Sequence, residues 1–136
     1  RLLRSRGMED ILSDDRVALR EMDGTLMVCG TPWAGEAGGA LNRVLPVSSI
    51  LLLKQGRGNR LMELSEREAA QKLLPVLSIP WYEPELLDEL LAFCSRIPEM
   101  APVYEFEFEP VDDAVGVIAD LAERMDAAGI RKHMRA

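Results

Sequence analysis

The chain has 136 residues, 48% of them hydrophobic and 29% charged, which is enough apolar material for one domain with a core. This composition excludes a wholly disordered chain. Apolar runs such as residues 50–53 fall far short of the roughly 20 residues of a membrane helix. Sixteen Lys and Arg against 23 Asp and Glu give a net charge of −7, which argues against nucleic acid and membranes as partners. We expect one domain over residues 1–129 and a basic tail over 130–136.

The cysteines indicate the compartment. Cys29 and Cys94 lie in apolar runs, with no CxxC pattern and no histidine nearby. Both are expected to be buried thiols, which argues against a disulfide framework and a zinc site. The chain begins with Arg1 and has no apolar leader, so we expect a cytoplasmic piece of a longer protein.

Two hairpins are predicted in the first half. Residues 1–6 have the pattern of the last turns of a helix that ends at Gly7. Residues 11–20 predict a strand interrupted by a polar pair, and the turn signal Asp23-Gly24 connects it to a strand at 25–29. Residues 30–46 form a glycine-rich loop that is longer than a connector needs, which favours a binding or active-site role. Residues 48–54, with 50–53 buried on both faces, and 60–64 predict a second hairpin around 56–59.

The second half is expected to carry three helices. Ser65 and Glu68 form a capping box for a helix that is interrupted at Pro75. A second helix is predicted from near residue 84 to just before Pro98, and a third from residue 112 or 113 to Gly129. Residues 103–109 alternate aromatic side chains with glutamates, which predicts a half-exposed strand with the aromatic side in the core. The predicted fold is an α/β domain with a mixed sheet, two hairpins and three helices mainly in the C-terminal half.

Asp14 and Asp15 are the sharpest candidates for chemistry. Two adjacent carboxylates at the end of an apolar strand are costly unless they meet a cation or a proton-transfer partner. In phosphoryl transfer, one such group typically holds Mg²⁺ and another accepts the proton of the attacking hydroxyl. Glu36, in the glycine-rich loop, is a candidate third oxygen ligand for magnesium. The alternatives are a polar strand end paired with Arg16, and a solvent-exposed Glu36.

Several common catalytic patterns are missing from the chain. Neither GxxxxGK[ST] nor GxGxxG can be written in it, so the glycines do not form a known phosphate cradle. The only histidine, His133, belongs to the tail, where a role in a catalytic triad is not expected.

Four segments occur in an order that resembles a known family. They are ILSDDRV at 11–17, GTPWAGE at 30–36, VLPVSSILLL at 44–53 and LSEREAA at 64–70. Over roughly residues 5–120, the chain resembles the HPr serine kinase/phosphatase-like P-loop proteins, which are related to phosphoenolpyruvate carboxykinases. The TPWAGE form resembles the broader kinase-like branch of that family rather than the genuine HPr kinases.

The resemblance implies roles for the candidate residues. Asp14 would be the acid/base on the substrate hydroxyl, Asp15 would support the metal, and Glu36 would complete the magnesium shell. The strand at 46–53 would be central in the sheet. In the family, a Walker A loop and its helix precede the Ser-Asp-Asp strand. No such loop occurs in this chain, so an intact parent is expected to bind Mg²⁺ and ATP and this piece alone to bind neither.

Two functions stay open on this basis. One is the C-terminal portion of an ATP-dependent phosphotransferase, whose phosphoacceptor stays open, with a protein substrate as one of the alternatives. The other is a non-catalytic remnant of the fold that works by binding a partner protein. A free sheet edge would also permit a homo-oligomer.

Overall fold

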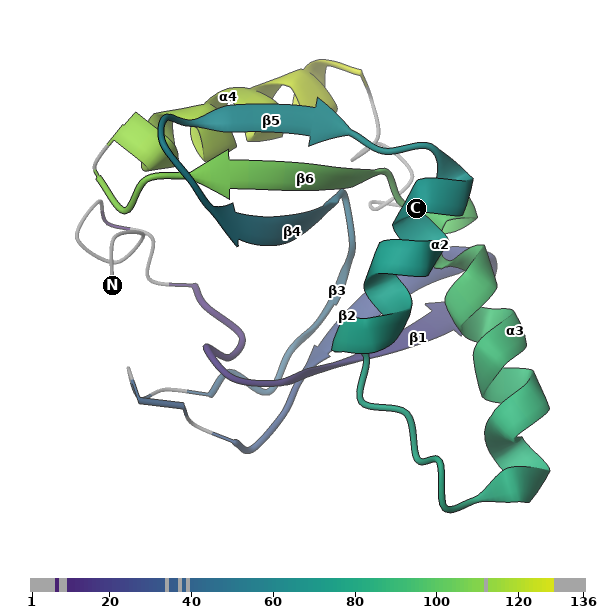
Figure 1. Ribbon diagram of the computed structural model, residues 1–136. Coiled ribbons are helices and arrows are strands. Elements are labelled where there is room, and N and C mark those ends of the chain that lie inside the picture. Colours follow the sequence, from purple (N-terminus) through teal and green to yellow (C-terminus); the bar gives the residue numbers. More distant parts are fainter. Residues whose placement is uncertain are drawn as a thin grey trace.

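In the part of the chain that the structure describes, the fold has two three-stranded sheets and three α-helices (Figure 1). The computed structural model describes residues 7, 10–33, 35–36, 38, 40–111 and 113–128. The first sheet is antiparallel, in the order β1-β2-β3, with strands Val17–Met22, Thr25–Gly30 and Val44–Pro46. The second is mixed, in the order β4-β6-β5, with strands Ile50–Gln55, Val103–Phe108 and Arg60–Glu63. The helices are α2 (Glu66–Leu73), α3 (Pro84–Met100) and α4 (Asp113–Ala127).

The α/β class and the three helices are therefore confirmed, whereas the single mixed sheet is wrong. Only the second sheet is mixed. The predicted helix at residues 1–6, the helix cap at Gly129 and the tail with His133 lie outside the described residues. Among the helices that are described, none combines the length and the apolar character needed to cross a membrane.

The first hairpin is confirmed, but its first strand is shorter than predicted. Asp23 and Gly24 have φ values of 50° and 75°, as a tight two-residue hairpin turn requires. The strand β1 begins at Val17, not at residue 11. The hydroxyl of Ser13 accepts hydrogen bonds from the backbone N–H groups of Asp15 and Arg16, both at 3.2 Å, and so bends the chain before the strand starts.

The second predicted hairpin is wrong, because β6 lies between β4 and β5. The loop at 56–59 wraps around the end of β6 instead of closing a hairpin. Gly56 N–H donates to the Phe108 carbonyl at 3.1 Å, and Asn59 Oδ1 accepts from the backbone N–H of Glu109 at 3.1 Å. A Cβ on Gly56 would lie 2.2 Å from Glu107 Cγ, so glycine permits this close approach.

The aromatic face of β6 lies in a core, as predicted, and α4 contributes to that core. Phe106 is 1% exposed and Tyr104 is 8% exposed. Leu121 and Met125 of α4 are buried in the same cluster as Tyr104. Figure 1 shows α4 lying along one face of the second sheet.

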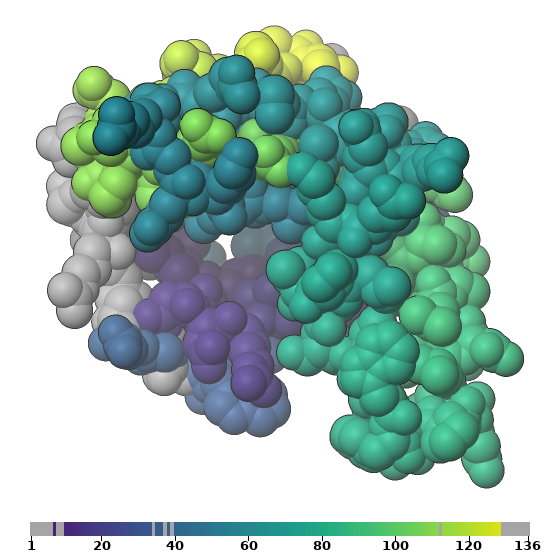
Figure 2. Space-filling view, in the orientation of Figure 1, coloured from purple at the N-terminus to yellow at the C-terminus, as the bar shows by residue number. Residues whose placement is uncertain are grey.

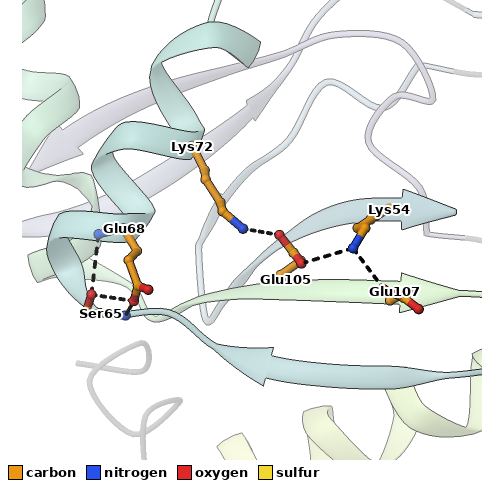
Figure 3. A network of polar contacts seen from close by, with 6 residues as sticks. All are labelled: Lys54, Ser65, Glu68, Lys72, Glu105 and Glu107. Atoms are coloured by element: carbon orange, nitrogen blue, oxygen red, sulfur yellow. Dashed lines mark hydrogen bonds and ion pairs between the residues drawn. The ribbon is translucent and has the colours of Figure 1, made fainter. Parts of the chain in front are cut away.

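The glutamate face of β6 is largely covered, whereas the predicted half-exposed strand would expose this face to solvent. The side chains of Glu105 and Glu107 are only 14% and 22% exposed. Lys72 of α2 bonds to Glu105, and Lys54 of β4 bonds to Glu107 at 3.0 Å (Figure 3). The hydrogen bond with Glu107 raises the pKa of Lys54, and the bond with Lys72 lowers the pKa of Glu105. These lysines cover the face that the alternating pattern assigns to solvent.

Among the described strands, β4 lies at the edge of the second sheet, which corrects the central place that the resemblance implies. Its predicted burial on both faces is also wrong, because its residues are exposed or partly exposed. Leu53 is 65% exposed. The larger core lies elsewhere, where β2, α2, α3 and the start of β6 meet. Its most buried members are Leu26, Ala69, Leu73, Ile97, Ala101 and Val103.

The helix α2 has the predicted capping box. Ser65 Oγ accepts from Glu68 N–H at 3.4 Å, and Glu68 Oε2 accepts from Ser65 N–H at 3.0 Å (Figure 3). The end predicted for α3 before Pro98 is wrong, since the helix continues to Met100. Pro98 and Ile97 are both buried, and their packing offsets the hydrogen bond that the proline cannot donate.

Candidate functional site

The Ser13-Asp14-Asp15 segment is held against the glycine-rich loop. Besides accepting two N–H groups, the Ser13 hydroxyl donates to the Trp33 carbonyl at 3.0 Å. Thr31 Oγ1 donates to the Arg16 carbonyl at 2.6 Å. The two conspicuous sequence segments, 11–17 and 30–36, therefore lie side by side, although the twelve residues 18–29 separate them in the chain.

The Asp14 carboxylate packs directly against Gly35. A Cβ built on Gly35 would lie 2.6 Å from Asp14 Oδ1 and 2.7 Å from its Cγ. Only glycine permits this approach without movement of the carboxylate. Since Glu36 follows Gly35 in the chain, Asp14 and the backbone that carries Glu36 share one corner of the molecule.

Asp15 lies at the entrance of a cleft. The cleft has a volume of about 660 Å³, within the roughly 300–1,000 Å³ of ligand pockets. Arg16, Thr31 and Trp33 line the same end, and the opposite wall is the segment 76–80 together with α3. In Figure 2 the N-terminal residues (purple) and the segment leading into α3 (teal) lie on the same face of the molecule.

All three predicted site carboxylates are exposed. Asp14 and Asp15 lie in the bend before β1 rather than on a strand, which corrects the predicted strand end. Within the described part of the chain, no three Asp, Glu, His or Cys side chains are grouped as a metal site. Magnesium usually takes one or two carboxylates and completes its shell with water and substrate phosphates, so Asp15 and Glu36 retain the chemistry it needs.

The sequence interpretation missed the cleft's far wall. Residues 76–80 read as a short apolar connector without periodicity. The signal that could have found the wall is the apolar cluster continuing into Trp81 and Tyr82, because such side chains are unusual in a solvent-exposed connector. They are 58% and 81% exposed.

The cysteines carry no reactive signature. Both are free, but only Cys94 is buried, whereas Cys29 is partly exposed, contrary to prediction. Burial raises the pKa of the Cys94 thiol, so this cleft-lining group stays protonated at neutral pH and is a poor nucleophile.

Comparison with known proteins identifies no relative. The chain matches no protein-family model, no curated protein and no solved structure. The function is therefore argued from the geometry of the site and from the motif order.

Proposed function

We propose that this chain contributes the acid/base and magnesium-binding carboxylates of an ATP-dependent phosphotransferase of the HPr kinase-like type. The observation that carries the proposal is the contact of the Asp14 carboxylate with Gly35. It joins the two segments on which the resemblance depends, and a shared catalytic corner requires such a contact. The phosphate-binding loop would come from a segment outside these 136 residues or from another chain.

The roles follow from the chemistry of phosphoryl transfer. Asp14 accepts the proton of the acceptor hydroxyl as that oxygen forms its bond to the γ-phosphorus, and the bond to the bridging oxygen breaks to release ADP. Asp15 and Glu36 would hold Mg²⁺ through their carboxylate oxygens, and the bound ion would supply positive charge for the phosphates. Arg16 lines the cleft beside Asp15 and would add a positive charge near the same phosphates.

The free edge of β4, in the second sheet, supports the proposal that a strand from outside these residues carries the phosphate-binding loop. The strand β4 runs parallel to β6, its other edge pairs with no described strand, and its Leu53 is 65% exposed. The unpaired backbone of an edge strand is a template for a further strand, so a strand carrying the phosphate-binding loop would find its place next to β4.

A non-catalytic interaction domain is the second candidate. The observation in its favour is the group of exposed apolar side chains before α3, with Val76 at 65%, Trp81 at 58% and Tyr82 at 81% exposure. Exposed apolar groups of this size mark protein-binding surfaces. A phosphotransferase acting on a protein would also present one, so the surface alone does not separate the candidates.

Nucleotide binding distinguishes the phosphotransferase from the non-catalytic interaction domain. In isothermal titration calorimetry, the full-length protein from which the chain derives is expected to bind Mg-ATP, and Asp14→Asn should keep binding while turnover is lost. Asp10→Asn is the matched control, because Asp10 is exposed and its described partner is Arg43, at 3.3 Å. Absence of ATP binding by the full-length protein would favour the interaction domain. Cytoplasmic location is part of the proposal and agrees with two free thiols.

A further inference from the structure

The cleft beside Asp15 differs from two hollows of similar size in its low charge. Two of its sixteen lining residues are charged, Asp15 and Arg16. Four of nine are charged in a hollow of about 530 Å³ between β1 and α3, and three of five in one of about 610 Å³ on α4. The cleft, at about 660 Å³, is therefore distinguished by its lining rather than by its size. A mostly apolar lining with a few polar groups is typical of small-molecule sites.

The floor of the cleft reaches the hydrophobic core, and its rim exposes apolar side chains to solvent. Cys94 and Ile97 of α3 line the cleft and are 8% and 0% exposed. Val17, Trp33 and Val76 also line it, but they are 44%, 58% and 65% exposed. A ligand with an apolar body would remove these three side chains from water, which the hydrophobic effect favours.

The polar groups of the lining include three that lie together at one end. Asp15 and Arg16 are neighbours in the chain, and the Thr31 hydroxyl donates to the Arg16 carbonyl at 2.6 Å. Since that hydroxyl gives its proton to the carbonyl, its oxygen is left to accept. The Asp15 carboxylate accepts and the Arg16 guanidinium donates, so this end fits a ligand group that does both. A net charge on the ligand would meet one of these two side chains with the same sign.

We propose that this cleft binds an uncharged small molecule with an apolar body and a hydroxyl group at the end near Asp15. The body lies over the floor formed by α3, and the hydroxyl bonds to the polar end. That this alcohol is the phosphoryl acceptor rests on the proposed function. In that reaction the hydroxyl proton goes to Asp14, the hydroxyl oxygen bonds to the γ-phosphorus of ATP, and ADP leaves.

A series of simple ligands tests the chemical class. 1-Octanol is titrated into the full-length protein without nucleotide, and binding is followed by saturation-transfer NMR. Saturable binding with a Kd below about 1 mM is expected, and 1-butanol should bind at least about tenfold more weakly because its apolar body is shorter. Octanoate and octylammonium should bind no more than about fivefold more tightly, since Asp15 and Arg16 are exposed and offset each other. No saturable binding of 1-octanol, or markedly tighter binding of either ion, would overturn the proposal.

A matched pair of tryptophans tests the location. Trp33 and Trp81 are both 58% exposed, but the lining of the cleft contains Trp33 and not Trp81. Trp33→Ala should weaken 1-octanol at least about fivefold, whereas Trp81→Ala should bind it within about twofold of the wild type. Val76→Asp, at an exposed position of the rim, is a second variant that should weaken binding. Equal effects of the two tryptophan substitutions would overturn the proposal.

Titration of the same protein with Mg-ATP keeps this proposal distinct from the proposed phosphotransferase. Binding of 1-octanol that depends on Trp33, without any binding of Mg-ATP, would support the ligand site and overturn its role as an acceptor site. Binding of Mg-ATP without binding of 1-octanol would leave the phosphotransferase standing and overturn the apolar alcohol, and a protein acceptor would take its place.

Discussion

The two sheets differ in how much of their surface is covered by other elements. The better covered second sheet contributes mainly to stability, and the candidate functional residues lie near the less covered first sheet. The second sheet packs its aromatic face on α4 and carries lysine–glutamate pairs on the other face. The first sheet buries only Leu26, and its strand β1 is exposed or partly exposed throughout. All three candidate carboxylates and the cleft belong to this less covered part. We therefore expect substitutions at buried positions, which lie mostly in and around the second sheet, to cost stability and those at exposed positions around the first sheet to change binding and chemistry.

Phe106→Ala should have the largest effect. The side chain is 1% exposed in the middle of β6 and stacks on Phe108 with ring centroids 5.7 Å apart. Its removal leaves a cavity and should lower the free energy of unfolding by about 3–5 kcal/mol, measured by urea denaturation. Leu53→Ala, at an exposed position of the neighbouring strand, is the control and should cost far less. Similar losses for the two variants would contradict the assigned core.

Leu26→Ala should have the next largest effect, because this residue ties the first sheet to the main core. It is 1% exposed and packs in the cluster that contains Ile97 and Val103. A loss of about 2–4 kcal/mol is expected in the same denaturation experiment. Val28→Ala, on the same strand but only partly buried, is the matched control and should lose less. A negligible effect of Leu26→Ala would mean that the two sheets are not joined through this core.

The features predicted from sequence are those with a local cause. The Asp23-Gly24 turn, the Ser65–Glu68 capping box and α4 are each specified by neighbouring residues. Strand order does not have a local cause. The turn signals at 56–59 are the same whether β4 and β5 pair directly in a hairpin or β6 lies between them. The alternation of β6 identified its aromatic core face, but Lys54 and Lys72 cover its glutamates from distant parts of the chain.

The candidate site was predictable only in part for the same reason. The segments 11–17 and 30–36 stand out in the sequence, and their contact through Ser13, Thr31 and Gly35 is consistent with a shared site. The cleft's far wall at 76–80 comes from a connector without periodicity, so its only signal was an apolar composition that continues into Trp81 and Tyr82. Asp14 was expected on a strand because the apolar residues before it continue the strand pattern, whereas the Ser13 hydroxyl bends the chain there.

Ser65→Ala should cost about 1 kcal/mol, since it removes an N-cap of α2. The Ser65 side chain lowers the pKa of Glu68 below its ordinary value of 4.5. Stability from this bond is therefore present above about pH 4.5 and is lost as the pH falls through the lower folded-state pKa. The difference between wild type and Ser65→Ala should shrink in acid, measured by thermal unfolding from pH 7 to pH 3. Ser78→Ala, outside any helix, should show no such dependence, and a constant difference across the range would contradict the capping role.

Gly35→Ala should have the smallest effect on stability and a specific effect at the site. The new methyl would displace the Asp14 carboxylate, which is an exposed side chain, so the loss should stay below about 1 kcal/mol. The carboxyl carbon resonance of Asp14 should shift in NMR, while that of Asp10 should not. An unchanged Asp14 resonance would contradict the contact that joins the two segments.

Calorimetric titration of the full-length protein with Mg-ATP is the decisive test of the proposed phosphotransferase. We expect binding that requires Mg²⁺, that Asp15→Asn weakens and that Asp10→Asn leaves unchanged. A full-length protein that folds and binds no Mg-ATP would contradict the assignment of Asp14, Asp15 and Glu36 to phosphotransfer.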